Sequence, residues 1–189
     1  MTKRSSWLMG VAAAGLAFSA HATTIPLVNG SFETGDLTGW TLSGNTGFMG
    51  VTCPGPGPDV AQGNCSFFAG PVGSEGFLNQ TFTAPAGSRA NVNFAWLTDG
   101  GTPSEFDVAF DGVTVFDRIN PAGPLTMSFL TVQGILGAGT THTLSFSFRD
   151  DPGFIFLDAV TLAVPEPATL GLLGAGIAGL FFSRRRKTA

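Results

Sequence analysis

The carboxylate of Asp158 stands in an otherwise apolar stretch near the end of the chain's central part. Phe154, Phe156, Val160 and Leu162 share its strand parity, so a regular strand would place all of them on one face. An unpaired carboxylate on an apolar face is costly. We therefore expect Asp158 to lie at a bulge, to accept backbone hydrogen bonds, or to bind a cation, and calcium suits such oxygen ligands.

Two cysteines, Cys53 and Cys65, flank a loop rich in glycine and proline, residues 54–64. This loop has no strand or helix pattern. The two ends of the chain indicate export, and export delivers cysteines to an oxidising compartment. We predict a disulfide, which contributes about 3 kcal/mol by restricting the unfolded chain. A metal pair and a reactive thiol are the alternatives, but no histidine is near and the spacing is not C-x-x-C.

Residues that could support catalysis are few. His142, the only histidine beyond position 21, shares strand parity with apolar neighbours, which favours a structural role. The sequence has no G-x-S-x-G, no H-E-x-x-H and no glycine-rich phosphate loop. Asp150 and Asp151 are adjacent, so on a strand they would point to opposite faces, and they favour a turn before Pro152. We predict that the protein is not an enzyme. A glycosidase using two carboxylates from different strands is the alternative.

Short alternating segments must position these residues. In residues 91–97, Val92, Phe94 and Trp96 fall on one face. Asp111-Gly112 predicts a hairpin turn. Strands are predicted at residues 40–43, 66–69, 77–83, 91–97, 106–110, 113–115, 126–132, 143–148 and 154–162.

The fold class follows from these short strands and from the absence of a helical period between the two ends of the chain. We predict an all-β protein, an antiparallel β-sandwich of the jelly-roll type. Its core should be rich in phenylalanine, because the chain has 18 Phe and no Tyr. We expect Trp40 and Trp96 to pack in that core.

The central part, residues 23–163, is long enough for one domain with a sizeable core. Its only cations are Arg89, Arg118 and Arg149, although the whole chain carries a net charge of -4. Nucleic-acid binding needs a basic surface, so we expect no nucleic-acid partner.

The N-terminal residues 1–22 have the three parts of a secretory signal peptide. Lys3 and Arg4 supply the positive charge, residues 7–19 form a short apolar run, and Ala20-His21-Ala22 is an A-x-A-like cleavage site. We predict cleavage between Ala22 and Thr23.

The C-terminal residues 164–189 also have three parts. Val164, Pro165, Glu166 and Pro167 come first, followed by the apolar run 168–182 and a basic end at 184–187 (Arg184, Arg185, Arg186, Lys187). As a helix the run is roughly 22 Å long, short for a bilayer core of about 30 Å, and arginine stems can recover part of the mismatch. We predict a transmembrane helix with the basic end in the cytoplasm.

This tail, taken as a whole, resembles the PEP-CTERM sorting signal. The resemblance implies a Gram-negative, exopolysaccharide-producing bacterium. It also implies a membrane transpeptidase partner, an exosortase, which removes the helix after transient anchoring in the inner membrane. The chain would then reach the cell surface or the extracellular matrix. The alternative is an ordinary membrane anchor that is never cut.

A second resemblance concerns the body. Asn29-Gly30-Ser31-Phe32-Glu33 with Gly39-Trp40, and Ile155 to Val160 at the end, are similar to the terminal segments of galactose-binding-like jelly rolls, which include carbohydrate-binding modules. The resemblance implies that the first and last strands meet, often at a structural calcium whose acidic ligands match Glu33 and Asp158. Ala159 stands where the usual ending has a second acidic residue.

These observations predict an exported, non-catalytic protein of the cell surface or the exopolysaccharide matrix. Calcium is the one cofactor that these residues suggest. A carbohydrate-binding module that binds extracellular polysaccharide is the alternative function.

Overall fold

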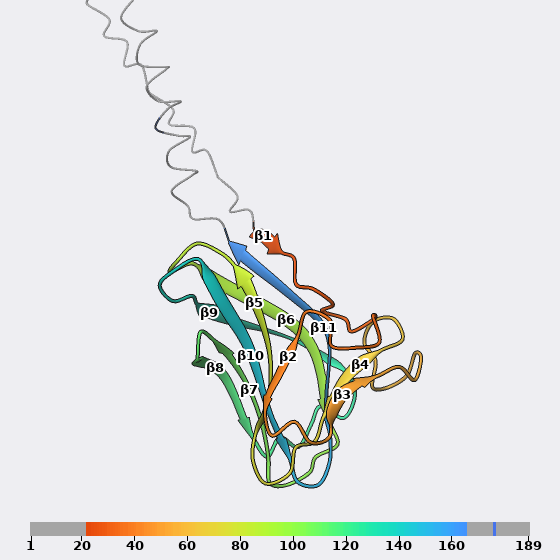
Figure 1. Ribbon diagram of the computed structural model, residues 1–189. Coiled ribbons are helices and arrows are strands. Elements are labelled where there is room, and N and C mark those ends of the chain that lie inside the picture. The colour runs from red at the N-terminus through yellow and green to blue at the C-terminus, as the bar shows by residue number, and fades with distance from the viewer. Residues whose placement is uncertain (1–21, 166–175, 177–189) are drawn as a thin grey trace, which may run out of the picture. The chain divides into compact units, whose positions relative to one another are not determined.

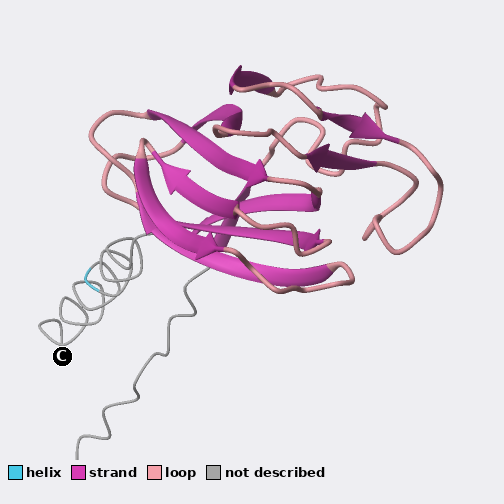
Figure 2. Cartoon of the chain, turned by 90° about the horizontal axis from the view of Figure 1, so that it is seen from below, coloured by secondary structure: helices cyan, strands magenta, loops and turns pink. Residues whose placement is uncertain are grey.

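The computed structural model describes residues 22–165 and the single residue Gly176. Within this part the chain forms eleven strands (Figure 1), and Figure 2 shows that strands and connecting loops make up the body. The strands are β1 (Ala22–Ile25), β2 (Thr41–Gly44), β3 (Met49–Thr52), β4 (Ser66–Ala69), β5 (Gly76–Thr83), β6 (Arg89–Thr98), β7 (Ser104–Phe110), β8 (Val113–Ile119), β9 (Ser128–Ile135), β10 (Thr141–Asp150) and β11 (Ile155–Pro165).

Two antiparallel sheets contain these strands. One has the order β3-β4-β11-β6-β9, with β1 also paired to β11, and the other has the order β2-β5-β10-β7-β8. Sequence neighbours such as β9 and β10 belong to different sheets, which is typical of a sandwich rather than a simple meander. The predicted all-β antiparallel sandwich is confirmed.

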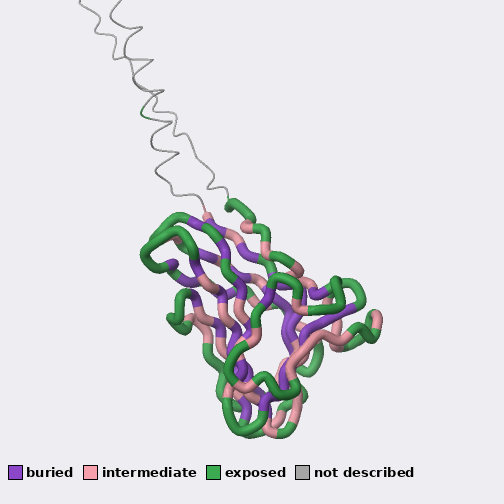
Figure 3. Tube along the Cα trace, in the orientation of Figure 1, coloured by how far each residue is buried: buried purple, intermediate pink, exposed green. Residues whose placement is uncertain are grey.

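Buried residues lie along the strands of the body (Figure 3, purple). Phenylalanine supplies most of the largest buried side chains of the core. Phe106 lies near its centre and stacks on Phe146 and Phe148. Trp40 and Trp96 are each only 6% exposed, so both tryptophans pack in the core as predicted. Fully buried aromatic rings come from Phe32, Phe67, Phe94, Phe106, Phe110, Phe146 and Phe148.

Nine of these eleven strands were predicted, although the first or last residue of several differs from the prediction. Strands β1 and β3 were not predicted, because four residues are too few to show an alternating pattern. Strand β9 begins two residues later than predicted and β11 continues to Pro165. The predicted hairpin at Asp111-Gly112 is confirmed: it joins β7 to β8, and both residues have positive φ.

The two segments that sequence reasoning assigned to processing meet in the sheet containing β11. Ala22 is opposite Pro165 and Thr23 is opposite Val164 in the β1–β11 ladder. The first half of the Val164–Pro167 motif therefore belongs to a sheet strand. Residues 1–21, Glu166, Pro167, the run 168–182 apart from Gly176, and the basic end 184–187 lie outside the described residues. No helix among the described residues is long and apolar enough to cross a membrane.

Candidate functional site

Asp158 lies at a β-bulge in β11. The register with β6 shifts between Asp158 and Thr161, and Ala159 has a φ of 52°. Leu157 before the bulge and Val160 after it both belong to the core, so the alternation of β11 is broken between them. The bulge that was one of the expected alternatives for Asp158 is therefore present, and it separates Asp158 from the face of Val160 and Leu162.

The carboxylate of Asp158 is fully buried and accepts backbone hydrogen bonds. Its Oδ2 accepts the amides of Ala61 and Gln62, both at 2.8 Å, and its Oδ1 accepts the amide of Ala159 at 2.5 Å. Burial raises the pKa of Asp158 above its ordinary value, and these three amide hydrogen bonds act in the opposite direction. Asp158 thus holds the loop between the cysteines against β11.

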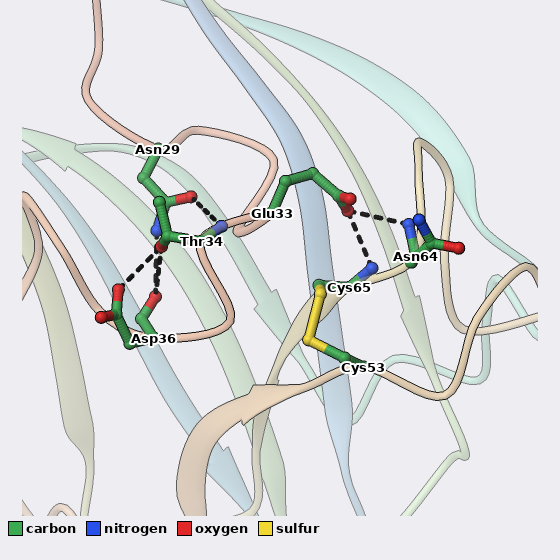
Figure 4. The surroundings of a disulfide bond; sticks show 7 residues. All are labelled: Asn29, Glu33, Thr34, Asp36, Cys53, Asn64 and Cys65. Atoms are coloured by element: carbon green, nitrogen blue, oxygen red, sulfur yellow. Dashed lines mark hydrogen bonds between the residues drawn. A yellow bond between two sulfur atoms is a disulfide. The ribbon is translucent and has the colours of Figure 1, made fainter.

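Glu33 holds the other half of the same loop (Figure 4). Its Oε1 accepts the amides of Asn64 and Cys65, both at 2.8 Å, and these backbone hydrogen bonds lower the pKa of Glu33. Gly63 has a φ of 77°, and a β-carbon there would collide with the Glu33 carboxylate. The loop therefore needs glycine at this position.

The disulfide between Cys53 and Cys65 closes this loop, with an S–S distance of 2.09 Å (Figure 4). The predicted pairing is confirmed. The expected meeting of the terminal segments is also present, because the Val160 amide donates to the Gly30 carbonyl at 2.8 Å.

At Glu33 and Asp158 the structure shows backbone hydrogen bonds, one of the expected alternatives. Four loop amides point their positive ends at Glu33 Oε1 and Asp158 Oδ2. The partial positive charges of these amides compensate the negative charge of the two oxygens, as a bound cation would. Calcium at this pair remains a prediction.

His142 has the structural role that its parity indicated. It is 1% exposed, its Nδ1 lies 2.8 Å from Asp111 Oδ2, and its Nε2 lies 3.2 Å from the Ala84 carbonyl. Burial acts to raise the pKa of Asp111, but hydrogen bonds from the Gly137 and Thr143 amides and from His142 lower it overall. The pair supports the β7–β8 hairpin.

A pocket of about 210 Å³ lies on the outer face of the sheet containing β10, and we call it the groove. Its walls are outward-facing side chains of β5, β7, β8 and β10 and the segment before β5. Hydroxyls, carboxylates and one aromatic ring contribute: the lining residues are Glu75, Phe77, Asp107, Ala109, Gly112, Thr114, Ser145 and Ser147.

Three carboxylates gather at one side of the groove. One oxygen each of Glu105, Asp107 and Asp117 lies within 4.8 Å of the others, because Asp107 is directly opposite Asp117 across the hairpin. Burial, then the charges of Asp117 and Glu105, raise the pKa of Asp107 to about 7. Its Oδ1 is buried without a hydrogen-bond partner, so this cluster could hold a proton or a metal ion.

Sequence reasoning did not find the groove. The available signal was two acids at alternate positions, Glu105 and Asp107, before the Asp111-Gly112 turn and a third acid, Asp117, after it. A hairpin bulge between Val108 and Ala109 shifts the pairing, so counting from the turn does not place Asp117 opposite Asp107.

Replacing Asp107 with Asn should change how stability depends on pH. Between about pH 4 and pH 7 the folded chain keeps a proton on Asp107 that the unfolded chain has lost, so stability falls as pH rises through this window. We expect Asp107→Asn to stabilise the protein at pH 8 by about 1 to 2 kcal/mol, since water at the open groove screens the charges, and to leave it almost unchanged at pH 4. Thermal melting at both pH values measures this, and equal effects at both would contradict it.

Comparison of the sequence with known families identifies the tail. Residues 163–187 match the PEP-CTERM protein-sorting motif, which confirms the resemblance noted for Val164, Pro165, Glu166, Pro167 and the basic end. A chain with this motif is an exported bacterial protein, sorted at the membrane. No curated protein sequence matches the chain.

Solved structures similar to the body are β-sandwich domains. The carbohydrate-binding module TmCBM61, in complex with β-1,4-galactotriose, is 20% identical with a TM-score of 0.53, over 74% of this chain and 98% of that one. A xylan-binding domain from Paenibacillus barcinonensis is 17% identical (TM-score 0.50, 81% and 100%). A stig cyclase from Fischerella sp. TAU is 18% identical (TM-score 0.59, 78% and 99%). At these identities the similarity shows the fold alone, an antiparallel β-sandwich of the jelly-roll type.

Proposed function

We propose that this protein is an exported, non-catalytic component of the cell surface or exopolysaccharide matrix, and that its groove binds extracellular polysaccharide. The observation that carries the binding proposal is the groove itself, a pocket on the outer face of a sheet in which polar side chains surround one aromatic ring. Such a surface suits a sugar, which presents hydroxyls at its edge and an apolar face.

Two hydroxyls of the groove are held in place by hydrogen bonds, one to another groove residue and one to Asn79. Ser147 Oγ donates to Glu75 Oε2 at 3.0 Å, and Ser145 Oγ donates to Asn79 Oδ1 at 2.6 Å. Groups held this way lose little freedom on binding, which favours affinity. The carboxylates select for sugar hydroxyls or amines as donors rather than for anionic sugars.

The sorting tail supports the location. The exosortase partner and the inner membrane as a transient anchor follow from the PEP-CTERM motif and remain part of the proposal, as do the Gram-negative envelope and the final place at the surface or in the matrix. An exopolysaccharide in that matrix is a ligand that a secreted sandwich would meet.

Replacing Phe77 with Ala should weaken polysaccharide binding about tenfold, since an aromatic contact contributes about 1 to 1.5 kcal/mol. The matched control is Phe129→Ala, which removes a 64% exposed phenylalanine from the other sheet and should leave affinity unchanged. Pull-down and titration with extracellular polysaccharide from the producing strain measure this. Equal affinity of the two variants, or no saturable binding by the unmodified chain, would refute the binding proposal.

A hydrolase is the second candidate, because a carboxyl with a pKa of about 7 inside a pocket suits a general acid. The non-catalytic proposal expects no release of reducing ends from the bound polysaccharide. Release that disappears in Asp107→Asn would favour the hydrolase instead.

A further inference from the structure

We propose that a divalent cation of calcium chemistry binds where β6 and β10 end, between the carboxylates of Asp150 and Asp99 and the carbonyl oxygen of Pro152. This cation site is separate from the groove and from the Glu33–Asp158 pair. It does not depend on the proposed polysaccharide binding.

Asp150 is a buried carboxylate whose hydrogen bonding is incomplete. Its side chain is fully buried, and its Oδ1 has no hydrogen-bond partner. Its Oδ2 has only a long contact, 3.4 Å, with Thr98 Oγ1. A carboxylate so placed is costly unless a donor or a cation compensates it.

No positive side chain supplies that compensation among the described residues around Asp150. The charges that act on it are those of Asp99 and Asp151, both negative. Arg149 is bound to Asp151 instead, through two hydrogen bonds of 2.8 and 2.9 Å. The local charge is therefore negative and attracts a cation.

Two glycines allow these oxygens to approach the backbone closely. A β-carbon built on Gly101 would collide with both Asp150 Oδ1 and the Pro152 carbonyl oxygen. A β-carbon on Gly153 would collide with Asp99 Oδ1 and would lie 2.8 Å from Asp150 Oδ1. Asp150 Oδ1 thus lies near the Pro152 carbonyl oxygen on one side and near Asp99 Oδ1 on the other, and none of these three oxygens accepts a hydrogen bond from a described residue.

Asp99 is held in this orientation by the backbone. Its Oδ2 accepts the Phe154 amide at 2.8 Å, which leaves Oδ1 directed at the shared space. Asp99 and Pro152 are exposed, so water can complete the coordination above the buried Asp150.

The three oxygen ligands determine which cation fits this site. All three ligands are hard oxygens, one of them a backbone carbonyl, and this set suits calcium, which accepts irregular geometry and mixed carboxylate, carbonyl and water ligands. Zinc favours nitrogen and sulfur ligands, and neither is present here. With two carboxylates and water in the shell, we expect the weak affinity of extracellular modules, a Kd of about 0.1 to 1 mM.

Calcium titration of the full chain tests the proposal. We expect 10 mM calcium to raise the melting temperature by about 5 °C relative to chelator, and isothermal titration to give the Kd above. Asp150→Asn should abolish both responses, yet be at least as stable as the unmodified chain in chelator, because the amide removes a buried negative charge and can donate to the Pro152 carbonyl.

Two matched variants locate the ion. Glu33→Gln at the loop carboxylates and Asp107→Asn in the groove should keep the calcium response of the unmodified chain. No calcium response in the unmodified chain would overturn the proposal and leave a protonated Asp150 as the explanation. Loss of the response in Glu33→Gln or Asp107→Asn, with Asp150→Asn still responding, would also overturn it.

Discussion

Replacing Pro165, Glu166 and Pro167 with three alanines should leave the chain uncut and full length in the inner membrane, whereas the unmodified chain should lose the segment after the motif. We expect the apolar run 168–182 and the basic end 184–187 to be sufficient for membrane insertion, and both are unchanged in this variant. Proline holds its own φ near -65° and favours an extended conformation in the residue before it. We therefore expect the motif to be a stiff segment that the proposed membrane transpeptidase can bind.

The sorting motif begins inside the folded sandwich. Pro165 lies in β11, opposite Ala22 of β1, so the sandwich continues to the start of the motif without a linker. A matched control, Pro56-Gly57-Pro58 replaced by three alanines in an exposed part of the disulfide loop, also removes two prolines and should be processed normally. Fractionation, blotting and mass spectrometry of the C-terminus measure the outcome. If the tail variant is cut and exported normally, the motif is not the sorting signal.

Replacing Asp158 with Ala should lower the free energy of unfolding by about 3 kcal/mol and the melting temperature by about 10 °C. The change leaves the amides of Ala61, Gln62 and Ala159 without their acceptor. A buried amide without a partner costs about 1 to 3 kcal/mol. The Ala159 amide is buried, whereas the hydrogen bonds of Ala61 and Gln62 are partly buried, so water offsets part of the cost there.

The matched control for Asp158→Ala is Asp59→Ala in the same loop, which should change stability by less than about 0.5 kcal/mol. Running both melts with and without chelator separates the two accounts of Asp158. Backbone hydrogen bonding predicts the same loss in both conditions. A loss confined to the chelator-free melt would show that calcium at Glu33 and Asp158 supplies the stability.

Much of the fold could be predicted because its strands follow a local rule. Buried and outward-facing side chains alternate throughout β7 and in the first halves of β6 and β10, and an alternating pattern can be read from the residues alone. The disulfide was equally accessible, because an exported chain with two cysteines has one possible pairing. The four-residue strands β1 and β3 were missed because their pairing partners, β11 and β4, rather than their own sequence, make them strands.

The sandwich class, the phenylalanine core, the Cys53–Cys65 pair and the sorting tail could be predicted from the residues, since each depends on residue type and short spacing. The surroundings of each carboxylate depend instead on how the folded chain brings distant segments together. The bulge after Asp158 turns that residue to the amides of a loop about a hundred positions away in the chain. Strand pairing places Asp107 opposite Asp117, and two loops bring Asp99 and Pro152 to Asp150. A carboxylate can bind amides, protons or cations, and the neighbours that decide among them are distant in the sequence.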